Sequence, residues 1–294
     1  MLWAQAGAGI AAASSTPLSL MIIGDLFEKD VRGRLVGTYF GCSFFASMMG
    51  MLFMGMVPWR WLFFIPAILG FVTAVSLYAL KTDLLKRVHV ATVNYWNIFS
   101  DVAIRKVFIF IFLMSALYHS VHKWYGLYLH REYGLGKETI SFFLVVAAVC
   151  GLLGQNIGGY LSDKKGRPVT CFIGEVILAV GTMGLFLRWP VGVVPVLLGI
   201  IVMGWTISHN SISTILTDFP DDDRPMIASL NSSVRFVSGG LGFSLSAFFV
   251  EKSFSGMFLM IGVLFLVLTI TQKNFIPNLG LASKMIKGGI DEQS

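Results

Sequence analysis

The sequence predicts an all-α protein that crosses a membrane repeatedly, with nine transmembrane helices. Of its 294 residues, 55% are hydrophobic and 13% are charged, whereas an ordinary soluble domain has roughly 45–50% apolar and 25% charged residues. The mean hydropathy is +0.76, and apolar runs of about 20 residues, long enough to span a bilayer core, recur along the chain. These observations argue against a soluble α/β fold with buried strands.

Three spans are predicted in the first 80 residues. The first, Met1 to Ile23, has small residues at every fourth position and no basic segment before it, which favours a packed helix over a cleavable signal peptide. A charged loop over 24–34 leads to the second span, which runs to Val57 and opens on glycines spaced by four: Gly33, Gly37 and Gly41. The third span is Leu62 to Leu80.

The polar interval 81–106 reads as a linker, in which Ser100 or Asp101 is placed to cap the next helix. Six further spans follow it, and a polar tail over 272–294 ends the chain. Their predicted bounds are Val107–Leu129, Ile140–Leu161, Val169–Leu187, Val191–Leu216, Met226–Val250 and Phe254–Thr271.

Charge and cysteine placement fit this topology. Most of the 22 Lys and Arg residues fall on the side that carries the linker and the tail, which the positive-inside rule makes cytoplasmic. The net charge of +6 is therefore explained by short loops, without a nucleic-acid partner. Cys42, Cys150 and Cys171 lie in or beside apolar runs and read as small core residues, so neither disulfides nor metal ligands are expected.

The segment 158–170, GGYLSDKKGRPVT, separates two of these spans. Gly158 and Gly159 allow a neighbouring helix to come close. Asp163 has two readings, a solvated loop acid or a cap on a helix N-terminus, where the dipole favours negative charge.

This segment resembles the signature loop of the major facilitator superfamily. The match, G-x-L-S-D-K-x-G-R, uses the residues Gly159, Leu161, Ser162, Asp163, Lys164, Gly166 and Arg167. Pro168 stands where that family usually has a second basic residue. A second pattern, Asp25-Leu-Phe with Arg32-Gly33, then a Gly-rich helix and W-R-W-x-F over 59–63, is similar to the fourth to sixth helices of the same family.

The resemblance implies two bundles of six helices, of which the first three helices would precede Met1 in upstream coding sequence. Residues 1–80 would be a partial N-terminal bundle, 81–106 the cytoplasmic linker, 107–271 the complete C-terminal bundle and 272–294 a cytoplasmic tail. The Asp25-Leu-Phe and Arg32 pattern is echoed by Asp218-Phe-Pro and Arg224, as expected for parallel repeats.

The resemblance also implies a secondary transporter that moves a small solute by rocking two bundles around a central site. A cytoplasmic latch is expected, in which Asp163 meets the helix that starts near Met226 and Arg167 pairs with Asp218. The residues assigned to the signature loop and its gate are Gly159, Asp163, Gly166, Arg167, Asp218, Asp25 and Arg32.

Charged residues inside spans are functional candidates, because burying Arg or Lys costs roughly 2.5 to 3.5 kcal/mol. Arg235 lies near mid-membrane with Asn231 on its face, and it has two readings, a substrate or coupling residue or a structural ion pair. His209 and Asn210 sit at similar depth, where the imidazole would relay protons or bridge helices. Gln155 invites the same two readings.

Lys123, one turn after His119, would line the cavity or snorkel to the surface. Glu175 lies on a helix that the resemblance makes peripheral, and it reads as a counter-ion to Arg235 or to the signature loop rather than as a proton carrier. Because the cavity helices then carry cations without an acid, the expected solute is an organic anion, such as a carboxylate or a phosphate ester.

The expected coupling is symport with a proton, through a His, or with sodium. A drug/proton antiporter is one alternative. The drug-antiporter branch of the family usually has a Gly-Pro pair in the fifth helix, and the matching stretch here, 41–50, has no Pro, which disfavours this alternative. A truncated, non-transporting membrane protein is the other alternative. The chain is expected to be a monomer in the plasma membrane with its C-terminus in the cytoplasm. Nothing resembles a nucleotide loop, a zinc cluster or a catalytic triad, so neither an enzyme nor a cofactor is expected.

Overall fold

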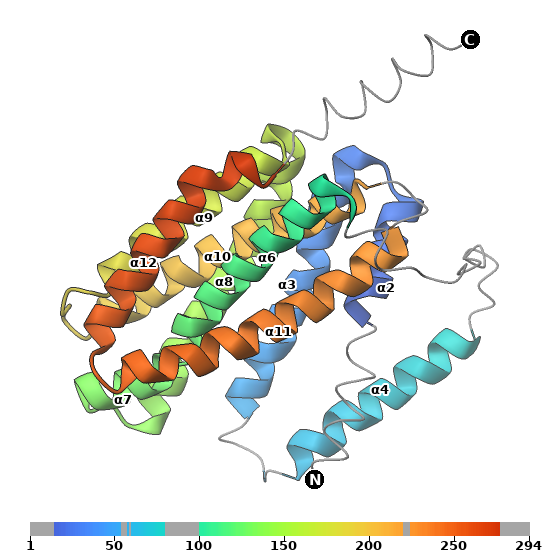
Figure 1. Cartoon of the computed structure of the whole chain (residues 1–294). Coiled ribbons are helices and arrows are strands. Elements are labelled where there is room, and N and C mark those ends of the chain that lie inside the picture. The colour runs from blue at the N-terminus through green and yellow to red at the C-terminus, as the bar shows by residue number, and fades with distance from the viewer. Residues whose placement is uncertain (1–14, 54–57, 59, 80–99, 220–223, 277–294) are drawn as a thin grey trace, which may run out of the picture.

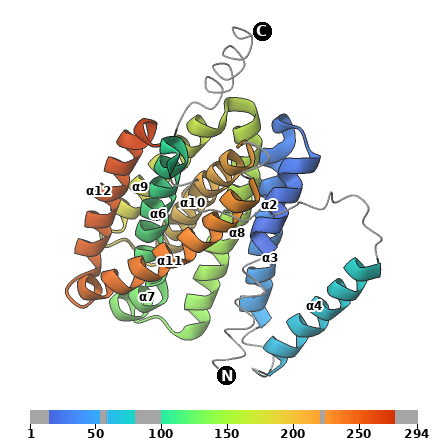
Figure 2. The same ribbon diagram turned by 45° about the vertical axis from the view of Figure 1, so that its right-hand side comes forward.

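A computed structural model describes residues 15–53, 58, 60–79, 100–219 and 224–276 (Figure 1). Within these ranges the chain is helical and contains no strand. The N-terminal part consists of α2 (Ser15–Leu26), α3 (Lys29–Phe53) and α4 (Trp61–Ala79). The described side chains of α4 are exposed, and α4 stands apart from the other helices in both views (Figures 1 and 2).

The C-terminal part is a bundle of seven α-helices and one short 3-10 helix. Its helices are α6 (Val102–His122), α7 (Tyr125–Tyr133), α8 (Lys137–Lys165), α9 (Arg167–Gly184), α10 (Val194–Thr217), α11 (Arg224–Val250), α12 (Phe254–Thr271) and η1 (Gln272–Asn274). The most buried of the long apolar helices is α10, which packs against both α8 and α9.

The predicted all-helical membrane fold is confirmed. Six helices of the described part, all in the C-terminal bundle, are long and apolar enough to cross a membrane, with α6 and α7 acting together as one span. The first predicted span lies mostly outside the described residues, which begin at Ser15, and the two shorter apolar helices of the N-terminal part are Ser15–Leu26 and Phe63–Ser76. The total of nine spans therefore stays a prediction.

Most predicted boundaries differ from the observed ones by a few residues, and two of the differences have a visible cause. The helix α6 begins at Val102, inside the predicted linker, because Asp101 is its N-cap: the carboxylate accepts hydrogen bonds from the N–H groups of Ala103 and Ile104. The predicted tail begins with η1, where the Gln272 amide donates to the carbonyl of Pro168. Most of the predicted linker and tail, 81–99 and 277–294, lies outside the described residues.

The helices α3 and α8 join the two halves of the chain and touch along their glycines. A Cβ atom on Gly33 would lie 2.7 Å from the carbonyl oxygen of Gly159, and one on Gly37 would lie 2.6 Å from the carbonyl oxygen of Gln155. These distances are too short for a side chain, so the predicted close approach at the spaced glycines is confirmed, and it fixes how the two halves are aligned.

Candidate functional site

Five charged side chains form a network at one end of the bundle, where α2 turns into α3 and α8 turns into α9 (Figure 1). We call it the signature-end network, and its members are Arg32, Arg34, Asp163, Arg167 and Asp218. Four ion pairs of 3.0 to 3.4 Å connect them. The network links α3 of the N-terminal part to α8, α9 and α10, so it ties the two halves together at this end.

Arg167 pairs with both acids of the network. Its Nη1 lies 3.0 Å from Asp163 Oδ1, and its Nε lies 3.3 Å from Asp218 Oδ2. It also donates to the carbonyl of Lys29 on α3. Gly166, just before it, has φ +90°, a backbone conformation that glycine adopts without strain, and this permits a one-residue turn between α8 and α9.

Arg32 supplies the N-terminal side of the network. Its guanidinium donates to the carbonyls of Gly24 and Phe27 in the N-terminal part. At the end of α10 it donates to the Thr217 carbonyl and the Asp218 carboxylate. The Arg of the first repeat therefore pairs with the Asp of the second. Asp25 lies near the end of α2 and is exposed.

The expected partner of Asp163 was wrong. Its carboxylate accepts hydrogen bonds of 2.9 Å from the N–H groups of Gly33 and Arg34, in the first turns of α3, and not from the helix that starts near Met226. The reason is packing: α8 runs along the glycines of α3, so the carboxylate at its end reaches the N-terminus of α3, whereas α11 packs mainly on α6. Asp163 is the cap rather than a solvated loop acid, since its side chain is only 4% exposed.

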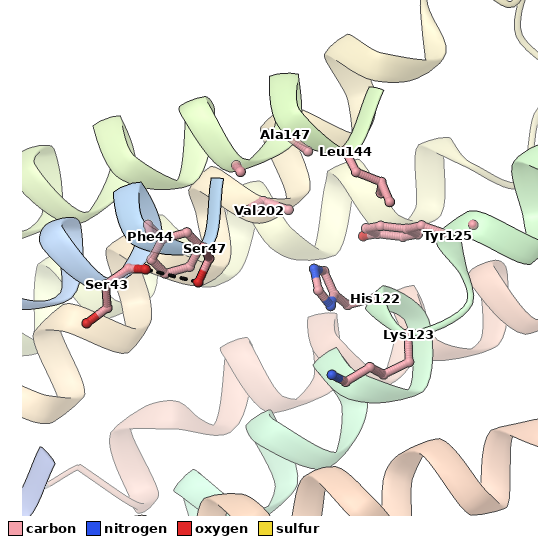
Figure 3. A pocket seen from close by; sticks show the side chains of 11 residues that line it. Ser43, Phe44, Ser47, His122, Lys123, Tyr125, Leu144, Ala147 and Val202 are labelled. Carbon is pink, nitrogen blue, oxygen red and sulfur yellow. Dashed lines mark hydrogen bonds between the residues drawn. The ribbon is translucent and has the colours of Figure 1, made fainter. Parts of the chain in front are cut away.

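A cavity of about 470 Å³ lies away from the network, between α3, the α6–α7 turn, α8 and α10 (Figure 3). Its polar lining is Ser43, Ser47, His122, Lys123 and Tyr125, and its apolar lining includes Phe44, Leu144 and Val202. Lys123 lies at this cavity and is also exposed, so both of its predicted roles stay open. His119 is not among the lining residues, and its Nδ1 lies 2.8 Å from the carbonyl of Ser115.

Arg235 lies on α11 and is not part of this cavity lining. Its Nε donates to the Asn231 side chain at 2.7 Å, while its Nη2 is buried and has no hydrogen-bond partner among the described residues. It forms no ion pair with any acid of the described part. The structural ion-pair reading is therefore not supported within those residues.

The other mid-membrane candidates lie on α8 and α10. The His209 ring packs edge-on against Phe40 of α3, and Asn210 donates to the carbonyl of Gly33 at 3.3 Å. Asn210 therefore bridges two helices at the contact between the halves. Gln155 is fully buried, and its amide atoms have no hydrogen-bond partner in the described part of the chain.

The expectation that Glu175 is a counter-ion was wrong. Its carboxylate is buried at 1% exposure and accepts a hydrogen bond from the Cys171 thiol, whose sulfur lies 3.1 Å from Ser208 Oγ. No cation of the described residues pairs with it. The reason is that the Glu175 side chain faces the Cys171 thiol of its own helix and lies near the Thr269 hydroxyl of α12, rather than a cation.

A family comparison identifies this architecture. The family model described as Major Facilitator Superfamily matches residues 1–242. The chain belongs to the major facilitator superfamily. A search of curated proteins gives no match.

Solved structures of major facilitator transporters share the fold. The human organic anion transporter MFSD10 (TETRAN) has a TM-score of 0.78 and 11% identity, with 87% of this chain and 67% of that chain covered. The proton:xylose symporter XylE has a TM-score of 0.70 and 14% identity, over 89% and 68% of the two chains. A bacterial homologue of the iron transporter ferroportin has a TM-score of 0.64 and 21% identity, with 84% of this chain and 65% of that chain covered.

This chain thus spans about two thirds of the length of these transporters. Because the sequence identities are low, the similarity to these structures shows only that the fold is shared. Together with the family, they support a transport role rather than an enzymatic one.

The sequence reading missed the aromatic and imidazole side chains around the cavity of this facilitator. The Tyr118 ring stacks on Trp205 at 4.0 Å between centroids and on His122 at 5.0 Å. His122 and Tyr125 line the cavity, yet both were overlooked in favour of His119. The only signal was the local run His119, His122, Lys123, Trp124 and Tyr125, which holds five polar or amphipathic residues inside a predicted span.

Proposed function

We propose that this facilitator is a secondary transporter of a small organic anion that works by alternating access. The observation that carries the solute class is Arg235: a guanidinium inside a span, with a buried Nη2 that has no partner among the described residues. An uncompensated cation in a low dielectric is costly, and a bound anion would relieve that cost.

The placement of the network and the cavity supports alternating access. The signature-end network closes one end of the contact between the halves, while the cavity lies on the side of the α6–α7 turn, toward the opposite end (Figures 1 and 3). We infer an outward-facing state, in which the network is the cytoplasmic latch and the C-terminus is cytoplasmic. Breaking these ion pairs would accompany inward opening.

Coupling is proposed to use a proton, carried by His209 or His119, in symport with the anion, with sodium as the other ion to test. Both imidazoles contact the ring of Trp205, so protonation of either would change the electrostatic environment of that ring. The proposed working form is a monomer in the plasma membrane.

Thermal unfolding of the purified protein tests the solute class. Benzoate and phenyl phosphate are compared with the cation benzylamine, for the original chain and for Arg235→Gln. Arg188→Gln is the matched control, because Arg188 is exposed and lies outside the spans. The two anions are expected to raise the unfolding temperature of the original chain and of the control, and to have less effect on Arg235→Gln.

Two outcomes would contradict the proposal. Stabilisation by benzylamine alone would favour the drug/proton antiporter. Equal stabilisation by anions with and without the guanidinium would remove Arg235 from the site. Uptake of a stabilising anion into proteoliposomes, with and without a pH gradient, then decides between a transporter and a non-transporting membrane protein.

A further inference from the structure

Gln155 is buried at the contact between the two halves of the chain. It belongs to α8, which packs against α3 of the N-terminal part and against α10 of the C-terminal part. The residue is 0% exposed, and neither its Nε2 nor its Oε1 has a hydrogen-bond partner in the described part of the chain. A buried polar group without a partner is destabilising by about 1–3 kcal/mol.

The helices touch closely on both sides of Gln155. One turn before it, a Cβ on Gly151 would lie 2.8 Å from both Phe44 of α3 and Val202 of α10, which Figure 3 shows on the cavity wall. One turn after it, a Cβ on Gly159 would lie 2.5 Å from a carbonyl oxygen of α3. Gln155 therefore stands in the middle of the contact, between the cavity and the signature-end network.

Asn210 of α10 brings a second amide to the same place. It is 0% exposed, and its Nδ2 donates to the Gly33 carbonyl at 3.3 Å, whereas its Oδ1 has no partner among the described residues. A Cβ on Gly37 would lie 3.1 Å from this Nδ2 and 2.6 Å from the Gln155 carbonyl oxygen. Both amide residues thus border one position of α3, and both keep polar atoms unpaired while α3 lies there.

Two opposing effects act on this contact. The ion pairs of the signature-end network and the close helix packing hold α3 against α8. The unpaired amides weaken the same contact, because water can hydrogen-bond to them once α3 moves away. Two conformations exchange readily only when their free energies differ by a few kcal/mol, so ion pairs and packing without this opposing effect would favour the closed contact strongly.

We propose that Gln155 is a release residue for the contact between the halves. Its unpaired amide lowers the stability of the closed contact, and hydration of the amide stabilises the state in which α3 has separated from α8. Gln155 acts on the opening of the signature end, although it is not among the residues that line the cavity. Its part in transport rests on the proposed alternating access, whereas its effect on the contact is measurable without transport.

The test replaces the amide by an apolar side chain of the same length, in Gln155→Met. The unfolding temperature of the purified full chain is expected to rise by about 2 °C or more, because the variant has no amide to leave unpaired. Gln272→Met is the matched control. The Gln272 amide is also buried, but it donates to the Pro168 carbonyl at 2.9 Å, so this variant loses a hydrogen bond and should unfold at a lower temperature.

Hydrogen exchange, followed by mass spectrometry, shows whether the effect lies at the contact between the halves. The segment 30–38 of α3 includes the N–H groups of Gly33 and Arg34 that bond to Asp163 of α8, so its exchange reports separation of α3 from α8. We expect exchange about five-fold slower in Gln155→Met and unchanged in Gln272→Met. Anion uptake into proteoliposomes should fall by a similar factor in Gln155→Met alone.

Two results would overturn the release residue. A lower unfolding temperature in Gln155→Met would show that the amide makes hydrogen bonds in the closed contact. A higher unfolding temperature with unchanged exchange over 30–38 would place the gain outside the contact between the halves. Slower exchange in a protein that moves no anion supports the release residue and overturns the proposed function. If Gln155→Met does not fold, Gln155→Leu, which also lacks the amide, must show the slower exchange.

Discussion

Asp163 and Gly33 meet at a contact that admits no side chain. Asp163 Oδ1 accepts a hydrogen bond of 2.9 Å from the Gly33 N–H, and a Cβ on Gly33 would lie 2.5 Å from the same oxygen. The glycine therefore lets the α8 carboxylate cap the N-terminus of α3, and one backbone position joins helix packing to the signature-end network.

Gly33→Ala should consequently open this contact. The added methyl group must displace Asp163 or separate α3 from α8, so we expect a loss of about 1–3 kcal/mol in the free energy of unfolding and reduced transport. Gly50→Ala, on the same helix with nothing within 4 Å of its Cβ position, is the control and should be neutral or slightly stabilising. Equal effects of the two changes would show that the contact is not tight.

Arg167 and Asp218 should behave as parts of one unit. Their pair is 3.3 Å long, with each side chain 12% exposed, and Asp218 also pairs with Arg32. Arg167→Ala and Asp218→Ala are expected to impair transport alike, and the double variant should be little worse than either, with a coupling energy of about 0.5–3 kcal/mol. Fully additive losses in a double-mutant cycle would argue against a latch.

Lys164→Ala serves as the control for that cycle. Lys164 belongs to the signature motif, but it is exposed and makes no ion pair within the described ranges. Its removal is expected to change stability by less than about 0.5 kcal/mol.

Glu175 should tolerate loss of its charge better than loss of its volume. Because no described cation pairs with it, Glu175→Gln keeps the shape and is expected to be neutral or stabilising. Glu175→Ala leaves a buried cavity beside α9 and should cost about 2–4 kcal/mol. Unfolding measurements compare both with Glu138→Ala, an exposed site; equal damage by Gln and Ala would indicate a carboxylate that needs its charge.

Asp101 offers a direct test of how α6 begins. Its carboxylate accepts from two N–H groups at 2.7 and 3.2 Å, so Asp101→Ala should cost about 1 kcal/mol and Asp101→Asn much less. Thermal unfolding of the two variants checks the order. An Asn variant as unstable as the Ala variant would mean that the charge, and not the hydrogen bonds, stabilises this end.

The sequence by itself determined the features that depend only on residues close together in the chain. Apolar runs matched the helices because hydropathy is a property of each segment, so Phe254–Thr271 was predicted with the bounds of α12. The Asp101 cap was predictable for the same reason. The Gly33 and Gly37 spacing indicated a close helix contact because small residues at every fourth position share one face.

Only the tertiary structure decided which partners those features meet. Asp163 was predicted as a cap, but the packing of α8 on α3 selected the N-terminus of α3 over that of α11. Glu175 lacks its expected counter-ion because packing places it against the Cys171 thiol and near the Thr269 hydroxyl of α12. The cavity lies against His122 of α6 rather than His119, since the face of a helix that meets a cavity depends on contacts between segments distant in the chain.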